Sequence, residues 1–301
     1  MAVLRFQLNP HPFIFRLIVI VFALSAVLLA PLGIVGAQDG TPVAEPDPVP
    51  LAAASAATLG YPALTIIATD TGFVVPEGIT AGRYYETHRN AGTFWSHFFT
   101  LRVPDEVSDE ELAASMKTEE DPEWLFEADV VGNADQTLPG KENHAIVDLA
   151  AGRYILLDPI RGLVGTFTVA EATSTEPPVE PVADFDVMMK EMVFEGLDDT
   201  VPAGQTIWKV TNTGSVWHEA VIIRVPEGTT EASMLAESED DGPDEEFINS
   251  LVQGSAVISP GNTAWMIVDL QPGTYAVICT FPSDDGRVHA MDGMLKVITV
   301  A

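Results

Sequence analysis

The 301-residue sequence is poor in basic side chains, and this shortage excludes one large class of partners. Lysine and arginine together number 14 against 44 aspartate and glutamate residues, so the formal net charge is −30. An acidic surface repels the phosphates of nucleic acids and anionic lipids, and the sequence has no basic stripe with interleaved aromatic residues. We therefore expect no nucleic-acid partner. The charge suits either plain solubility or a basic partner protein.

Cysteine is nearly absent, because Cys279 is the only one in the chain. A single cysteine excludes a disulfide within one molecule, so Cys279 is a free thiol, a metal ligand or a link between two molecules. A lone cysteine is often no more than a small buried apolar side chain. The residues that accompany Cys279, described below, favour the metal ligand.

Beyond the N-terminus, no stretch is long and apolar enough to cross a bilayer. The N-terminus places Arg5 and Arg16 around the start of an apolar core (17–30), followed by small residues up to Ala37, which predicts a secretory signal cleaved after Ala37. An uncleaved N-terminal anchor is the alternative. Removing residues 1–37 takes away two arginines and no acids, so −30 becomes −32 for the mature chain. We expect an extracytoplasmic protein, either secreted, periplasmic or at the cell surface.

Signatures of catalysis are missing as well. The sequence has no nucleophile elbow, no phosphate-binding loop and no histidine pair at metalloprotease spacing. Its many carboxylates form no arrangement that singles out a general acid and a general base. No small-molecule substrate is evident from these patterns, and we predict that the protein is not an enzyme and has no catalytic residues.

Short apolar runs broken by glycine and proline fill the chain from about Tyr61, which is typical of an all-β protein. Residues 38–58, rich in alanine and proline, indicate a disordered linker before these runs. A second segment rich in proline and glutamate, 172–182, divides the remainder. We therefore predict two domains, 59–171 and 183–301, each of ordinary size.

The two predicted domains are copies of one another. ITAGRYYETHRNAGTFWSHFFTLRVP aligns without a gap with VPAGQTIWKVTNTGSVWHEAVIIRVP, and VDLAAGRYILLD aligns with VDLQPGTYAVIC. The aligned blocks are 79–104 with 201–226, 147–158 with 268–279, and 165–170 with 293–298. Such a repeat predicts two tandem domains of a single fold.

Each copy carries a short helical insertion between its aligned blocks. In the first copy, Ser108 and Glu111 form a capping box, and Asp121-Pro122 indicates the start of a second helix. In the second copy, the acidic residues 244–246 lead into an apolar helix that we expect Gly254 to end.

The second copy holds a set of metal-binding side chains. Cys279 ends a predicted strand, the loop beyond it supplies His289 and Met294, and the Asn-x-Gly turn of NTGSVWHEAVI precedes His218. Copper accepts thiolate, thioether and imidazole together, and a blue-copper site takes two histidines, one cysteine and a weak axial methionine. Met291 is a fallback for the axial position.

The first copy lacks this whole set. The alignment places Ser96 opposite His218, Asp158 opposite Cys279 and Thr166 opposite Met294, and the loop SDDGRVH has no counterpart in the first copy. If these side chains were ordinary core residues, there would be no reason for all of them to be absent from the first copy at once. The comparison therefore favours Cys279 as a ligand over Cys279 as a small apolar residue.

The second copy resembles the cupredoxins, the family that includes plastocyanin and azurin. The matching pieces are the Asn-x-Gly turn followed by a histidine, and then Tyr…Cys…His…Met-Leu ahead of the last strand. Nine residues separate Cys279 from His289, more than in plastocyanin-like chains, and Pro282 with Asp285-Gly286 can reverse such a loop.

The resemblance implies two tandem cupredoxin-like Greek-key β-sandwich domains with short helical insertions. It also implies copper as the cofactor, bound in the C-terminal domain by His218, Cys279, His289 and Met294, and single-electron transfer with a soluble or membrane redox partner. One alternative is a non-redox binding or structural module at the cell surface that keeps the fold without the metal. Copper storage or delivery through the same residues is another.

Overall fold

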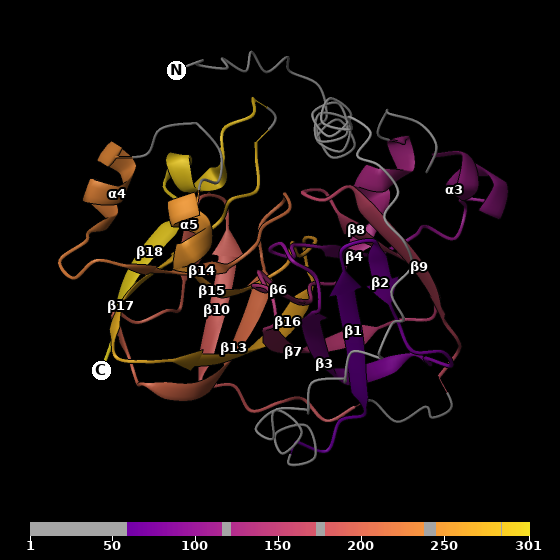
Figure 1. Cartoon of the computed structure of the whole chain (residues 1–301), viewed down its shortest axis with the longest axis horizontal. Helices are drawn as coiled ribbons and strands as arrows, with labels where there is room; N and C mark the ends of the chain where they lie inside the picture. The colour runs from indigo at the N-terminus through magenta and orange to yellow at the C-terminus, as the bar shows by residue number, and fades with distance from the viewer. Residues whose placement is uncertain (1–58, 116–121, 173–177, 238–244, 284) are drawn as a thin grey trace, which may run out of the picture.

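The computed structural model describes residues 59–115, 122–172, 178–237, 245–283 and 285–301 (Figure 1). Strands dominate these residues, and the α-helices among them span at most seven residues. The prediction of an all-β protein with short helical insertions is confirmed. Among the described residues, no helix is long and apolar enough to cross a membrane. The predicted signal (1–37) and linker (38–58) lie outside the described residues.

Residues 59–171 are called the first half below, and the parts of them that the structure describes contain nine strands, a short α-helix and a 3₁₀ helix. They are β1 (Ala63–Thr69), β2 (Gly72–Val74), β3 (Gly82–Asn90), β4 (Phe99–Arg102), α3 (Asp109–Ser115), the 3₁₀ helix η1 (Glu123–Glu127), β5 (Asp129–Val130), β6 (Ala134–Asp135), β7 (Glu142–Leu149), β8 (Gly152–Asp158) and β9 (Leu163–Val169).

Residues 183–301 are called the second half, and outside 238–244 and 284 they contain nine further strands, two short α-helices and a 3₁₀ helix. They are β10 (Phe185–Lys190), β11 (Val193–Glu195), β12 (Thr200–Val201), β13 (Gly204–Asn212), β14 (Val221–Val225), α4 (Glu231–Glu237), α5 (Glu245–Ser250), β15 (Leu251–Ser255), β16 (Thr263–Leu270), β17 (Gly273–Ile278), the 3₁₀ helix η2 (His289–Asp292) and β18 (Leu295–Val300).

Alternation of apolar and polar residues explains how the strands form a sandwich. In β1, Leu64, Ile66 and Ala68 are buried while the residues between them are partly exposed. The residues of β13 alternate in the same way, with Trp208 and Val210 buried. Successive side chains of a strand point to opposite faces, so this pattern presents one apolar face for packing against a second sheet.

The strands of the described residues form three sheets. One has eight strands in the order β11-β10-β13-β16-β7-β3-β1-β2, one has six in the order β12-β18-β17-β14-β15-β6, and one has four in the order β5-β4-β8-β9. The core of the second half lies between the eight-stranded and six-stranded sheets. A core of the first half lies between the eight-stranded and four-stranded sheets. The long sheet is thus covered by a different short sheet over each half.

The strand pairings of the first half recur in the second. β1 pairs in parallel with β3, and β10 pairs in parallel with β13. The antiparallel series β4-β8-β9 has its counterpart in β14-β17-β18. The aligned sequence blocks therefore occupy matching places in the two halves.

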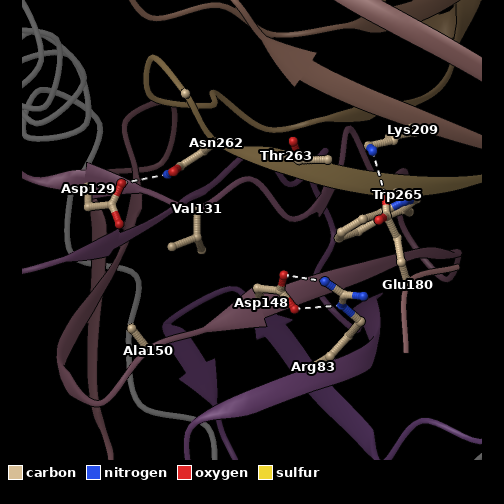
Figure 2. A pocket seen from close by; sticks show the side chains of 11 residues that line it. Arg83, Asp129, Val131, Asp148, Ala150, Glu180, Lys209, Asn262, Thr263 and Trp265 are labelled. Carbon is tan, nitrogen blue, oxygen red and sulfur yellow. Dashed lines mark hydrogen bonds and ion pairs between the residues drawn. The ribbon is translucent and has the colours of Figure 1, made fainter. Parts of the chain in front are cut away.

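The two halves share a continuous sheet. β16 pairs with β7 through Trp265 and Ile146, and β6 pairs with β15 at another sheet edge. Beside this junction, a polar cleft of about 400 Å³ has Trp265 in its wall (Figure 2). Its cations are already paired, because Arg83 bonds to Asp148 at 2.7 Å and Lys209 bonds to Glu180.

The helical insertions match the predictions in the first half and depart from them in the second. The Glu111 N–H donates to Ser108 Oγ at 3.1 Å, as the capping box predicts, and η1 begins directly after Pro122. The second predicted helix was wrong beyond Ser250, because residues 251–255 form β15 and not helix. Pairing with β14 gives this segment a ladder of hydrogen bonds that the local sequence does not reveal.

Candidate metal centre

Cys279 lies immediately after β17, at a point where the strand alternation turns its side chain toward the core. Val277 and Tyr275, two and four residues earlier, are buried on the same face. The Cys279 N–H donates to the Met294 carbonyl at 3.1 Å, and the Ala290 N–H donates to the Cys279 carbonyl at 2.9 Å. These bonds tie the cysteine backbone both to the following loop and to the start of β18.

The Asn-x-Gly turn after β13 presents His218. Asn212 accepts the Gly214 N–H at 2.9 Å and donates its amide to the carbonyls of Val216 and Ile258, both at 2.7 Å. His218 exchanges two backbone hydrogen bonds with Ile258. The asparagine therefore closes the turn and fixes the backbone from which the imidazole projects.

Gly214 leaves room for the imidazole. A Cβ at this position would lie 2.7 Å from Glu191 Oε1 and 3.1 Å from His218 Nε2. Contacts below 3.0 Å are not tolerated without a shift of the neighbours. A larger residue here would thus have to push aside the Glu191 carboxylate and press against the His218 ring.

The long interval between Cys279 and His289 folds back as a small hairpin, as Pro282 and Asp285-Gly286 predicted. The Gly286 N–H donates to the Ser283 carbonyl at 2.9 Å, and the Ser283 N–H donates to the Arg287 carbonyl at 2.7 Å. The His289 N–H then reaches the Phe281 carbonyl at 3.0 Å. The extra residues therefore lengthen the loop without moving His289 away from Cys279.

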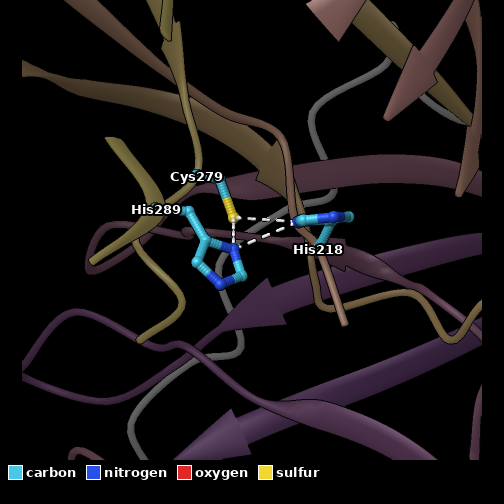
Figure 3. A group of neighbouring side chains, drawn as sticks. All are labelled: His218, Cys279 and His289. Atoms are coloured by element: carbon cyan, nitrogen blue, oxygen red, sulfur yellow. Dashed lines mark hydrogen bonds between the residues drawn. The ribbon is translucent and has the colours of Figure 1, made fainter. Parts of the chain in front are cut away.

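His218, Cys279 and His289 converge on one point, as Figure 3 shows. The two Nδ1 atoms are 3.1 Å apart, and the cysteine Sγ lies 3.4 Å from His289 Nδ1 and 3.9 Å from His218 Nδ1. A point equidistant from the three atoms lies about 2 Å from each of them, close to the 2.0–2.3 Å of metal–nitrogen and metal–sulfur bonds. The donor atoms are therefore spaced for a metal ion.

Burial keeps both imidazoles neutral at neutral pH. It lowers the pKa of His218 to about 4, with a further lowering by the neighbouring His289 and a smaller opposing effect from Glu191. Burial also lowers the pKa of His289. A neutral imidazole offers a lone pair to a metal, whereas a protonated imidazole does not. The two rings are thus in the form that binds metal.

Burial acts in the opposite way on the thiol, because it raises the pKa of Cys279, and the nearby Glu219 raises that pKa further. A thiolate at this fully buried position needs a compensating cation. The Glu219 N–H, 3.5 Å from Sγ, and the backbone N–H of Phe281 are neutral donors and do not supply such a charge. A metal ion between the sulfur and the two rings would supply the missing positive charge, so these residues fit a metal.

Met294 is fully buried immediately before β18 and packs in the same core cluster as Cys279. Its N–H donates to the His289 carbonyl at 2.9 Å. Met291, the fallback, lies partly buried within η2. The structure brings three of the four predicted ligands together by their donor atoms, and the axial role of Met294 stays a prediction.

The matched positions of the first half hold an ion pair that the sequence did not indicate. Arg161 donates to Asp158 Oδ2 at 2.6 Å and to Ser96 Oγ at 2.9 Å, and His88 bonds to the same hydroxyl at 3.0 Å. The guanidinium thus lies between the residues aligned with Cys279 and His218. The one local signal was the spacing of Asp158 and Arg161, three residues apart in a turn.

Comparisons with known proteins give weak likenesses only. No protein-family model matches the chain, and no curated protein matches it. A reduced auracyanin from the photosynthetic bacterium Roseiflexus castenholzii is 26% identical, with a TM-score of 0.29, over 38% of this chain and 94% of that chain. Auracyanin A from Chloroflexus aurantiacus, described as a blue copper protein, is 17% identical, with a TM-score of 0.25, over 38% and 99% of the two chains.

The prediction that the chain is not an enzyme is wrong as it stands. A multicopper oxidase is similar at 14% identity and a TM-score of 0.24 over 79% of this chain and 88% of that chain. Because the similar structures include an enzyme as well as auracyanins, the likeness does not separate a carrier from an oxidase. The metal centre is therefore judged on its own geometry.

Proposed function

We propose that the chain binds copper in a type 1 (blue) centre formed by His218, Cys279 and His289, with Met294 as the weak axial ligand, and that it transfers single electrons. The observation that supports this most is the convergence of one sulfur and two ring nitrogens within 3.1–3.9 Å of one another. Two imidazoles and one thiolate in a trigonal set are the ligands of blue-copper electron-transfer sites.

Bound copper would supply the chemistry by alternating between its cuprous and cupric states as one electron enters or leaves. The surrounding residues hold the ligands fixed during this exchange. The Cys279 backbone is bonded on both sides, and the His218 backbone is bonded twice to Ile258. Fixed ligands reduce the rearrangement that accompanies each change of charge. The burial of all three side chains excludes water from the thiolate.

The same proposal covers the tandem arrangement and the location. Residues 59–171 and 183–301 are proposed to be copies of a cupredoxin-like fold, of which the first has replaced its metal ligands by Ser96 and Asp158. The recurrence of the strand pairings supports this. The chain is proposed to act outside the cytoplasm, on the support of the signal pattern in residues 1–37.

The test is to add Cu(II) to the purified full chain and to record visible absorption and EPR spectra. We expect an intense thiolate-to-copper band that disappears in Cys279→Ser. His144→Gln, which removes a histidine outside the site, is the matched control and should keep the band. A weak colour that Cys279→Ser leaves unchanged would contradict the proposal, as would tight binding of Zn(II) with no copper–thiolate band.

A further inference from the structure

A row of aromatic rings connects the proposed centre with the surface. The His289 ring lies 6.0 Å from the Phe281 ring, Phe281 lies 5.7 Å from Trp217, and Trp217 lies 6.4 Å from Phe126 (centroid to centroid). His289 is only 2% exposed, whereas Phe126 is 50% exposed. The row thus leads from a buried ligand to an open side chain.

The outer end of this row belongs to the other half of the molecule. Phe126 lies in η1 of the first half, between the buried Trp124 and Leu125 on one side and Glu127 on the other. Trp217 and Phe281 come from the second half, yet both pack against the core cluster that contains Trp124 and Leu125. The insertion of the first half therefore covers the side of the centre where His289 lies.

Because the insertion of the first half covers the centre, it limits the routes by which an electron can reach the copper ligands. The three converging ligands have no exposed edge, so an outside partner cannot touch them. The electron must pass through protein, and electron tunnelling weakens steeply as the gaps between packed groups widen. Adjacent rings about 6 Å apart by centroid are in van der Waals reach of one another. Trp217, next to His218 in sequence, also connects the row to a second ligand.

The surface around Phe126 has a definite charge. Glu123 and Glu127, which flank it within η1, are exposed. Asp129, two residues after Glu127, is a further partly exposed carboxylate on this side. An exposed aromatic side chain among carboxylates suits a partner that presents a basic rim around an apolar centre, because opposite charges steer the encounter and the apolar contact fixes it.

We propose that Phe126, Trp217 and Phe281 form the electron path to His289, and that a basic one-electron redox protein docks on the first half at Phe126. This inference rests on the proposed function. In each encounter one electron moves, the centre is oxidised as the partner is reduced or the reverse, and no covalent bond or proton changes place. The first half would thus serve as the docking unit for a centre that it does not contain.

The test uses the full chain loaded with copper and ferric cytochrome c as a basic one-electron probe. Phe126→Leu keeps an apolar side chain but removes the ring, and Phe126→Tyr restores a ring. Phe94→Leu is the matched control, since Phe94 is a 47% exposed phenylalanine of the same half, at the position aligned with Val216. Stopped-flow mixing then gives the second-order electron-transfer rate of each variant.

We expect Phe126→Leu to keep the copper spectrum and to lose about tenfold in rate, a typical size for a change at one interface, while Phe126→Tyr and Phe94→Leu stay close to the wild type. A Phe126→Leu chain with a normal spectrum and an unchanged rate overturns the route and leaves the copper centre standing. A wild-type chain without the copper–thiolate band overturns the proposed function, and the route with it.

A second readout needs no copper. Binding of cytochrome c to the metal-free full chain is measured by calorimetry at low salt. We expect the pair Glu123→Gln and Glu127→Gln to weaken this binding, and the pair Glu195→Gln and Glu227→Gln, on exposed positions of the second half, to leave it unchanged. Equal weakening by both pairs shows attraction to net charge alone and overturns the docking site.

Discussion

Both halves bury polar side chains at the same aligned positions, but the side chains and the groups beside them differ. In the second half, two neutral imidazoles and a thiol surround a point that a metal ion would fit. In the first half, Ser96 and Asp158 occupy the matched positions and bind the guanidinium of Arg161. A cation fits between the buried groups in both halves. The first half supplies it from its own chain as Arg161, and under the proposed function the second half would take it from solution.

The supporting turns differ little between the halves. Gly92 and Gly214 follow equivalent asparagines, and a Cβ on either would lie 2.7 Å from a carboxylate oxygen, of Asp70 or of Glu191. The next obstacles include Arg161 Nη1 in the first half and His218 Nε2 in the second, each just over 3 Å away. The scaffold is therefore shared, and only the group that it surrounds has changed.

The largest effect is expected from removing the internal cation. Arg161→Met leaves Asp158, whose side chain is fully buried, without its partner, and breaking a buried pair in this way costs about 3–5 kcal/mol. Urea denaturation of the metal-free chain measures the loss. Lys209→Met, which breaks a pair with the exposed Glu180, should cost no more than about 1 kcal/mol. Equal losses of stability in the two variants would mean that the buried Arg161–Asp158 pair contributes no more than the exposed Lys209–Glu180 pair.

The next effect is a dependence of stability on pH that arises in the first half. Burial alone lowers the pKa of His97, but the Asp135 carboxylate 2.5 Å away, with Glu219 and Asp158, raises it to about 9. Between the ordinary value of 6.5 and about 9, the folded state holds a proton that the unfolded chain has lost. The free energy of unfolding should therefore fall as pH rises through this interval, by on the order of 2 kcal/mol.

Denaturation curves at several pH values check this dependence. Asp135→Asn removes the carboxylate that holds the proton and should flatten the fall. His218 does not contribute, because its pKa of about 4 keeps it neutral throughout the interval. A slope that survives in Asp135→Asn would have to come from another buried acid, such as Glu86, whose pKa burial raises to about 8.

The smallest effect is expected from substitutions in the two matched turns, which should differ in their influence on the copper spectrum. Gly92→Ala and Gly214→Ala each push a methyl group against a carboxylate, and each should cost roughly 1 kcal/mol of stability, the low end for overpacking. Only Gly214→Ala should also change the visible spectrum of the copper-loaded chain, because its second contact is His218. A spectral change in Gly92→Ala would show that the two turns are not independent.

Local patterns predicted the strands and the converging ligands well. Strand alternation directed Cys279 to the core, the turn residues predicted the reversal that returns His289, and the repeat placed His218 opposite Ser96. Arg161 could not be predicted, because it lies outside the aligned blocks and the alignment shows which ligands are missing without showing what replaces them. Phe126 was missed for a similar reason, since it lies in the insertion between the aligned blocks, where the two copies do not align.

The pairing of β16 with β7 could not be predicted from the sequence either, for a different reason. Both strands have the sequence pattern of ordinary buried strands, and this pattern does not specify the strand with which each of them pairs. That choice depends on how the two sandwiches dock, which involves residues far apart in the chain. The residues that became β15 show the same limit on a smaller scale, because pairing with β14 overrode a local preference for helix.

The pairing of β16 with β7 also has a consequence for the history of the molecule. If the halves were separated, β16 and β7 would each become an edge strand with unpaired backbone groups. Such exposed edges pair with other chains and lead to aggregation. Under the proposed function, the half that carries the metal ligands would therefore be poorly suited to move alone into another protein by recombination. The first half, which lacks those ligands, would still be needed for the strand edge that it covers.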